Sequence, residues 1–241
     1  KGERPTGSSD PYALRRAANG ILLILWSKGW QLSINEIIKD SLIYWKQLFS
    51  SIDFDKDTLY CELTEFFRQR IISLLEEKEI QVDIIQSIAG NTTSTERLLD
   101  DPTDVDFRAS LLMNMRRNNT LNLLQAVVTR ASKLAAKSSI PINVIDPSDF
   151  VDNSLFEKEC EIQMFNVLQK LKPLAINGDH IKYKLLAEGL SSSAETLSNF
   201  FDGEGSVMVM TDNINLRNNR LNLLSILRNQ SFIIADFSKL T

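Results

Sequence analysis

The amino-acid sequence predicts an all-α protein. In several segments, apolar residues recur at the three- and four-residue spacing that places them on one face of a helix. Three Ser-x-x-Glu sequences can cap helix starts, because the serine hydroxyl accepts a hydrogen bond from a free backbone amide while the glutamate reaches back. Alternating strand patterns are scarce, and the apolar stretch at residues 207–210 is too short to anchor a sheet.

These signals locate the predicted helices along the chain. The capping boxes predict helix starts at Ser33, Ser154 and Ser192. Breaks are predicted at residues 90–94 and 138–148, where glycine, proline and short polar residues gather. Three apolar helix faces contain, in chain order, Leu14, Ala17, Ala18, Ile21, Leu22 and Leu25; then Phe66, Phe67, Ile71, Leu74 and Leu75; then Leu121, Leu124, Val128, Ala131 and Ala135.

Composition indicates the class of protein and the cellular compartment. A hydrophobic content of 43% and a charged content of 24% are ordinary for a globular protein. Cys61 and Cys160 lie far apart, so neither a zinc site nor a disulfide framework is predicted. The longest apolar run, residues 21–26, is too short to span a bilayer, and the start does not resemble a signal peptide. We therefore expect a cytoplasmic protein without a membrane partner and, because Lys1 is not a methionine, a piece of a longer chain.

Catalytic machinery is not expected in this chain. His180 is the only histidine, which excludes histidine-based catalytic triads and histidine metal clusters. No ATP-binding signature is present. The sequence therefore predicts no catalytic, metal-binding or cofactor-binding residues.

Basic residues are concentrated in one segment. The net charge of −4 argues against indiscriminate binding of polyanions, and we expect no DNA binding. Residues 107–145, however, contain no Asp or Glu and hold six of the 27 basic residues, which leaves 21 against 31 acidic residues elsewhere. Such a segment in an acidic protein predicts a localised phosphate-binding face. Its basic residues are Arg108, Arg116, Arg117, Arg130, Lys133 and Lys137.

The helix predicted from residue 121 onward has one apolar and one polar half. Arg130, Lys133 and Lys137 are spaced i, i+3 and i+7, which places them on one stripe. Cations of this kind bind phosphates, and neighbouring amides and hydroxyls can meet base edges, so the stripe is a candidate RNA-binding surface. The alternative is an ordinary solvated helix face. The apolar half contains Leu121, Leu123, Leu124, Val127, Val128, Ala131, Leu134 and Ala135, and the polar half also contains Asn122, Gln125 and Thr129.

Arg220 lies among the leucines of the last predicted helix. Burying a cation alone is costly, so we predict a structural ion pair for Arg220 rather than RNA contact. Its candidate partners are Asp202, Asp212 and Asp236. At the edge of the same face, Arg217 and Arg228 are weaker phosphate-binding candidates, and the sequence assigns Phe200 and Phe201 to the core.

Three stretches of this chain resemble known synthetase segments. Phe200-Phe201-Asp202, Val207-Met208-Val209-Met210, Arg217-Asn218-Asn219-Arg220-Leu221-Asn222-Leu223-Leu224 and Ile234-Ala235-Asp236-Phe237 together resemble the signature of helical anticodon-binding domains of aminoacyl-tRNA synthetases. Ser9-Asp10-Pro11-Tyr12-Ala13-Leu14-Arg15-Arg16-Ala17-Ala18-Asn19-Gly20 resembles the Asp-Pro-Phe-Ala-Leu-Arg-Arg-Ala segment of the β subunit of bacterial-type glycyl-tRNA synthetase. Val128-Thr129-Arg130-Ala131-Ser132-Lys133-Leu134 is similar to that family's Asn-Lys-Arg-x-x-Asn-Ile-Leu helix, with Thr129 in place of lysine and Lys133 in place of asparagine, and the loop at residues 202–206 is longer than in many members.

The resemblance implies an anticodon-binding helical bundle in a larger enzyme. It implies that residues 1–90 form the tail of an HD-like domain with connecting helices, and that residues 91–241 form the anticodon-binding domain. The implied enzyme is glycine–tRNA ligase, a heterotetramer of two α and two β subunits that joins glycine to tRNA for protein synthesis. The implied partners are glycine tRNA and the α subunit, through α–β or β–β contacts. The α subunit is implied to use ATP and magnesium, and this chain is implied to be non-catalytic by itself.

The implied role is recognition of the anticodon arm. Glycine codons begin with GG, so each glycine tRNA presents two anticodon cytosines, whose edges a helical bundle can read once the bases leave the loop. Two alternatives remain open at this stage, namely the anticodon-binding domain of another synthetase such as arginyl-tRNA synthetase, and a helical module that binds only protein. The candidate RNA-binding residues are Arg116, Arg117, Asn122, Thr129, Arg130, Lys133 and Lys137.

Overall fold

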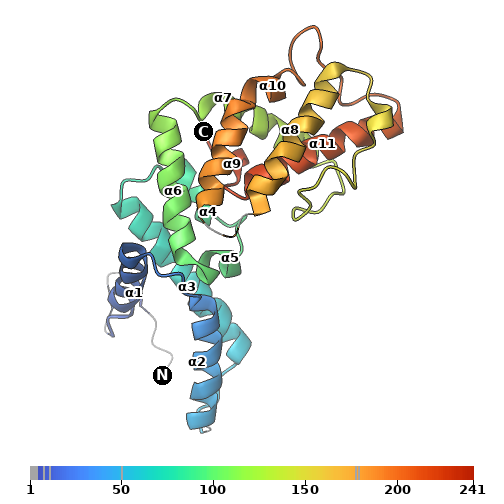
Figure 1. Cartoon of the computed structure of the whole chain (residues 1–241). Helices are drawn as coiled ribbons and strands as arrows, with labels where there is room; N and C mark the ends of the chain where they lie inside the picture. The colour runs from blue at the N-terminus through green and yellow to red at the C-terminus, as the bar shows by residue number, and fades with distance from the viewer. Residues whose placement is uncertain (1–4, 8, 11, 50, 177, 179) are drawn as a thin grey trace. The chain divides into compact units, whose positions relative to one another are not determined.

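The computed structural model describes residues 5–7, 9–10, 12–49, 51–176, 178 and 180–241. Within these residues the chain forms helices and no strand, which confirms the predicted all-α class (Figure 1). The α-helices are α1 (Leu14–Lys28), α2 (Ile34–Leu48), α3 (Lys56–Glu77), α4 (Val82–Ala89), α5 (Thr95–Asp100), α6 (Pro102–Arg117), α7 (Asn122–Ala135), α8 (Glu159–Ile176), α9 (Ile181–Ser192), α10 (Ala194–Ser198) and α11 (Ile214–Phe232), and the 3-10 helices are η1 (Asn153–Leu155) and η2 (Phe237–Lys239).

The chain divides into two compact units, Lys1–Ser110 and Leu111–Thr241, and the division falls inside α6. The predicted break at residues 90–94 is present as the turn between α4 and α5. Because α5 packs on α2 and α3, residues 91–110 nevertheless belong to the first compact unit. The assignment of an HD-like tail to residues 1–90 and an anticodon-binding domain to residues 91–241 stays a prediction.

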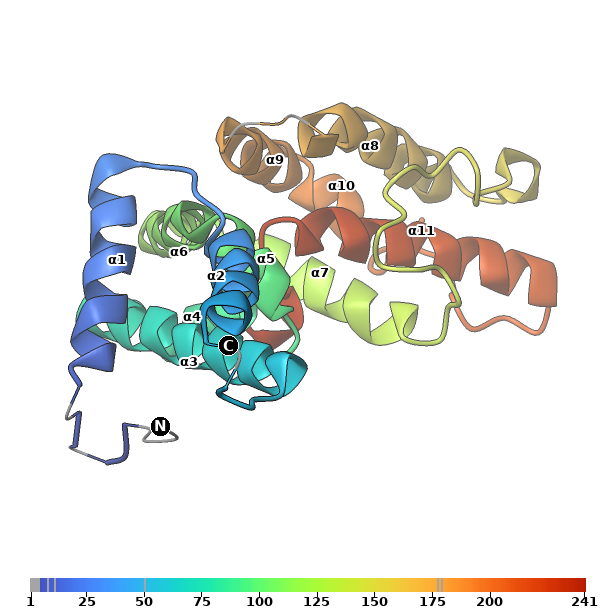
Figure 2. The same cartoon turned by 90° about the horizontal axis from the view of Figure 1, so that it is seen from below.

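In the first unit, α3 contacts α1, α2, α4 and α5 (Figure 2). Its buried face contains Ile71, Leu74 and Leu75, three of the five residues predicted there. Asp10, in the segment that resembles the β-subunit family, caps α1 by accepting hydrogen bonds from the backbone amides of Leu14 at 2.8 Å and Arg15 at 3.2 Å. Pro11 of that segment lies outside the described residues.

The predicted apolar face of α1 is wider than the face that the unit buries. Ala18, Leu22 and Leu25 are buried, but Leu14, Ala17 and Ile21 are exposed. Within its unit, α1 packs mainly on α3, and one helix covers only a narrow stripe of another. The spacing therefore identifies the helix correctly but overestimates how much of its surface is covered.

Arg68 joins α3 to the turn between α4 and α5. Its side chain is buried, and its guanidinium donates hydrogen bonds to the carbonyl oxygens of Ala89 at 2.9 Å, Gly90 at 2.7 Å and Thr93 at 2.7 Å. Glu65, one turn earlier on α3, accepts from Nε of Arg68 at 3.0 Å. The last carbonyls of a helix have no partner within the helix, so one side chain here completes the hydrogen bonding of the end of α4.

In the second unit, α11 lies between α7 and α8 and buries residues around most of its circumference (Figure 2). Phe200 and Phe201 are both buried, as predicted. On α9, Gly189 faces α8 so closely that a Cβ atom there would lie 2.8 Å from Cδ2 of Leu171. Glycine at this position therefore permits the close packing of α8 and α9.

One of the three predicted capping boxes caps a helix in the structure. The hydroxyl of Ser33 accepts a hydrogen bond from the amide of Glu36 at 3.1 Å at the start of α2. Ser154 instead lies within η1, which Asp152 caps. Ser192 remains inside α9, where its hydroxyl donates to the carbonyl oxygen of Gly189 at 3.0 Å. The last two predictions are wrong because the preceding chain offers these serines other hydrogen-bond partners.

Candidate nucleic-acid interface

The helix α7 is amphipathic, and its buried face holds it against the second unit. Leu124, Val127, Val128 and Ala131 are buried, and the helix packs on α11 and η2. Leu123, predicted in the apolar half, is exposed instead. Burial of the other face leaves the polar residues of α7 on the surface of the unit.

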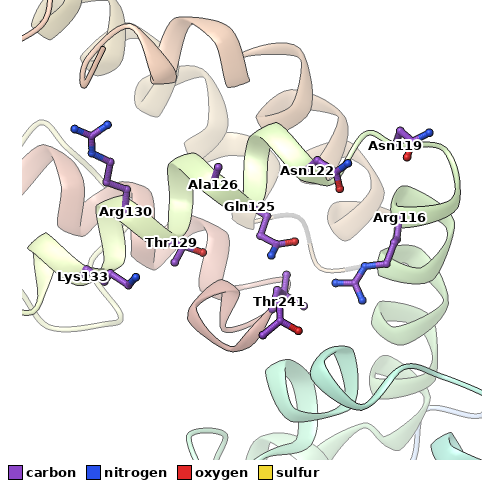
Figure 3. A pocket seen from close by; sticks show the side chains of 10 residues that line it. Arg116, Asn119, Asn122, Gln125, Ala126, Thr129, Arg130, Lys133 and Thr241 are labelled. Carbon is purple, nitrogen blue, oxygen red and sulfur yellow. The ribbon is translucent and has the colours of Figure 1, made fainter.

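A cavity of about 570 Å³ lies along this polar face, and we refer to it as the α7 pocket (Figure 3). Five of the seven predicted RNA-binding residues line it, whereas Arg117 and Lys137 do not. The carboxyl-terminal residues Leu240 and Thr241 form another part of its wall. The complete lining consists of Arg116, Asn119, Asn122, Gln125, Ala126, Thr129, Arg130, Lys133, Leu240 and Thr241.

Arg130 is held in place by two groups from the segment after α10. Its Nη1 lies 2.7 Å from Oδ1 of Asp202, and its guanidinium carbon lies 4.6 Å from the centre of the Phe201 ring. The Arg130 and Asp202 side chains are 50% and 65% exposed, and exposed pairs contribute only about 0–1 kcal/mol to stability. The contact therefore orients the cation more than it stabilises the fold.

Thr129 and Lys137 differ from the predicted arrangement. The Thr129 hydroxyl donates to the carbonyl oxygen of Phe237 at 3.1 Å, so it ties α7 to η2 while its side chain lines the pocket. Lys137 lies in the turn after α7, since the helix ends at Ala135, and does not extend the helical stripe as predicted. Arg117 ends α6 and is exposed outside the pocket lining.

Four polar side chains of the α7 pocket make no hydrogen bond or ion pair with the part of the chain that the structure describes. They are the ammonium of Lys133 and the carboxamides of Asn119, Asn122 and Gln125. Gln125 was not among the predicted binding residues, although it lies one turn after Asn122 on the same polar face. That i, i+3 relation places Gln125 beside Asn122, but it does not distinguish Gln125 from the other polar residues of the helix.

Comparison with known proteins identifies the family. Residues 1–90 match the family model described as glycyl-tRNA synthetase beta subunit. The glycine–tRNA ligase beta subunit of Gloeothece citriformis is 38% identical over 237 residues, which cover 97% of this chain and 32% of that protein. That of Clostridioides difficile is 31% identical over 241 residues, which cover 99% of this chain and 32% of that protein. The chain belongs to the glycine–tRNA ligase β-subunit family.

The chain spans about a third of the length of the curated β subunits that it matches. Two stretches that resemble synthetase segments meet in the structure of this family member. The α7 stretch contributes Arg130, and the double-aromatic stretch contributes Phe201 and Asp202, which contact it. The two stretches therefore support one another physically next to the α7 pocket.

Arg220 is the second arginine of the signature in the last α-helix of this chain. It is buried and ion-paired as predicted, but its partners differ from the predicted ones. Its Nε donates to Oε1 of Glu161 at 2.9 Å, its Nη2 to Oε2 of Glu157 at 3.0 Å, and its Nη1 to the carbonyl oxygen of Met208 at 3.0 Å. The predicted partners Asp202 and Asp212 are therefore wrong, because the start of α8 packs against α11 at this point. Burial alone lowers the pKa of Arg220, but the hydrogen bonds and attraction of the two glutamates outweigh it and raise the pKa above its ordinary value.

Two other arginines of this chain make contacts that support the fold. Arg108, counted within the basic segment, is buried and pairs with Asp104 at 2.8 Å. Arg228 donates to the carbonyl oxygens of Ala135 at 3.3 Å and Ile140 at 3.2 Å, and its burial lowers the pKa of its guanidinium. The Arg228 side chain thus binds the end of α7 and the following loop rather than presenting itself to phosphate.

The described ranges contain neither a metal-ligand cluster nor a membrane-spanning helix. No group of three or more His, Cys, Asp or Glu side chains there is arranged to hold a metal ion. Among the same residues, no helix combines the length and the apolar character needed to cross a membrane.

Proposed function

We propose that the second unit binds the anticodon arm of glycine tRNA on behalf of a glycine–tRNA ligase. The main observation in its favour is the α7 pocket, in which Lys133 and three carboxamides lack partners within the described chain. An ammonium binds phosphate, and carboxamides carry both a donor and an acceptor for base edges. Buried cations such as Arg220 and Arg108 already have carboxylate partners, so Lys133 remains the stronger candidate for phosphate binding.

The proposal places this chain within a larger reaction. The relatives are named as ligase β subunits, so the proposed assembly contains an α subunit that activates glycine with ATP and magnesium in the cytoplasm. Two α and two β subunits complete the proposed heterotetramer. In that assembly, the anticodon contact positions the acceptor end of the tRNA, and positioning converts binding energy into rate.

Lys133→Ala tests the phosphate contact. We expect the variant to bind glycine tRNA about tenfold more weakly, because a charge-assisted hydrogen bond is lost. We also expect the slope of log affinity against log salt to fall by about 0.7 to 1, which corresponds to one released counterion. Fluorescence anisotropy at several salt concentrations measures both quantities.

Lys170→Ala is the matched control, because Lys170 is an exposed lysine of α8 outside the pocket lining. The control is expected to bind like the unmodified chain. Equal losses in the two variants would contradict a role for the α7 pocket. If the chain is folded by circular dichroism and binds neither glycine tRNA nor an anticodon-substituted tRNA, the protein-interaction alternative replaces the proposal.

Asp202→Asn is expected to strengthen binding of the same tRNA about two- to fivefold at low salt. The substitution removes a carboxylate that neutralises Arg130, and unscreened negative charge repels phosphate. The gain should shrink as salt rises. Glu188→Gln, at an exposed position on α9, controls for the change in net charge, and a weaker Asp202→Asn complex would show that the ion pair is needed to position Arg130.

A further inference from the structure

Gln125 occupies a distinctive place in the α7 pocket. Its side chain is half-buried, and it points from α7 into the space that Arg116 also enters from the end of α6 (Figure 3). Its carboxamide has no hydrogen-bond partner within the described chain and is reached by solvent, so both its donor and its acceptor are available to a ligand. An amide presented in this way suits a ligand that carries a matching donor and acceptor.

The surroundings of Gln125 match the parts of a single nucleotide. Asn122, one helical turn earlier, supplies a second carboxamide without a partner in the described chain. Arg116 and Lys133 supply cations on the two sides of Gln125 along the pocket, and a planar guanidinium can also lie against a base. A volume of about 570 Å³ is within the range of ordinary ligand pockets and accommodates a base with its ribose.

We propose that the α7 pocket holds one anticodon cytosine turned out of the loop, and that Gln125 is the residue that binds its Watson–Crick edge. The proposal rests on the proposed tRNA-binding function and names the group that would confer base recognition. The N4 amino group of cytosine donates a hydrogen bond and its N3 accepts one. The carboxamide of Gln125 offers the complementary acceptor and donor side by side.

Gln125 and Lys133 thereby have different roles, since one recognises a base and the other binds the RNA backbone. Lys133 contacts the backbone of the RNA, so its loss weakens binding to any sequence. Gln125 contacts a base, so its loss matters only when that base is present. A residue that merely supports the fold would weaken both kinds of RNA equally.

The test is a double-substitution cycle between protein and RNA. The full 241-residue chain and its Gln125→Met variant are titrated with glycine anticodon stem-loop RNA, and with the same RNA carrying an abasic nucleotide at the middle or the last anticodon position. Methionine keeps the length and helix propensity of glutamine but makes no strong hydrogen bond. Gln169→Met, at an exposed position of α8 outside the pocket, is the control.

We expect Gln125→Met to bind the normal RNA about tenfold more weakly, and to bind one of the two abasic RNAs as well as the unmodified chain does. The other abasic RNA should still distinguish the two proteins. Equal losses on all three RNAs, or no loss on any, overturn the assignment of Gln125. Salt-sensitive binding that Lys133→Ala weakens survives that outcome, so failure of base reading is distinct from failure of tRNA binding.

Discussion

Arg220→Ala is expected to lower the free energy of unfolding of the second unit by about 3–5 kcal/mol, because the substitution leaves a buried carboxylate without its cation. The Glu161 side chain has no exposed surface, and Arg220 is its ion-pair partner on α11. Among the described residues, the carboxylate keeps the backbone amides of Glu157 at 2.9 Å and Lys158 at 3.0 Å as its remaining donors. Urea unfolding followed by circular dichroism measures the loss.

The double variant Arg220→Met with Glu161→Gln provides the matched comparison. It removes both charges while keeping side chains of similar size, so it should be less destabilised than Arg220→Ala. A loss below about 1 kcal/mol in Arg220→Ala would show that water or a neighbouring group replaces the arginine. A double variant that is less stable than Arg220→Ala would assign the effect to packing instead of charge.

Arg68→Ala is expected to destabilise the first unit by about 2–4 kcal/mol, since three carbonyl oxygens lose the guanidinium at once and, of the three, the Gly90 oxygen keeps the Thr93 amide as a donor at 3.0 Å. The affected groups belong to Ala89, Gly90 and Thr93, so the end of α4 and the start of α5 should open first. Hydrogen exchange of backbone amides locates the opening, and urea unfolding gives its size.

Arg68→Lys separates charge from geometry, because an ammonium lacks the planar fork that reaches three acceptors. We expect it to recover less than half of the lost stability. Arg16→Ala, at an exposed position of α1, should leave the unfolding curve unchanged. Full recovery by lysine would contradict the role of guanidinium geometry.

The sequence predicts the helices and the buried face of α7 because both depend on neighbours three or four residues away. Leu124, Val128 and Ala131 illustrate this, since their spacing alone places them on one side of the helix. The same local reasoning places Phe200 and Phe201 in the core. These successes require no knowledge of which helix lies opposite.

Contacts between distant segments could not be predicted in the same way. Arg220 is correctly expected to be buried and paired, but the choice of Glu161 depends on how α8 packs against α11. Asp202 pairs with Arg130, 72 positions away in the sequence, and no local pattern encodes that distance. Gln125 was missed for a related reason, because a glutamine on a polar helix face becomes distinctive only when a cavity lies beside it.

The position of Asp202 in the segment after α10 has an evolutionary consequence. Surface loops tolerate insertions and deletions that a packed helix does not. A change in the length of residues 202–206 can therefore move a negative charge toward or away from Arg130 without any substitution in α7. Related chains can in this way change the charge beside Arg130 while α7, and the core beneath that helix, remain the same.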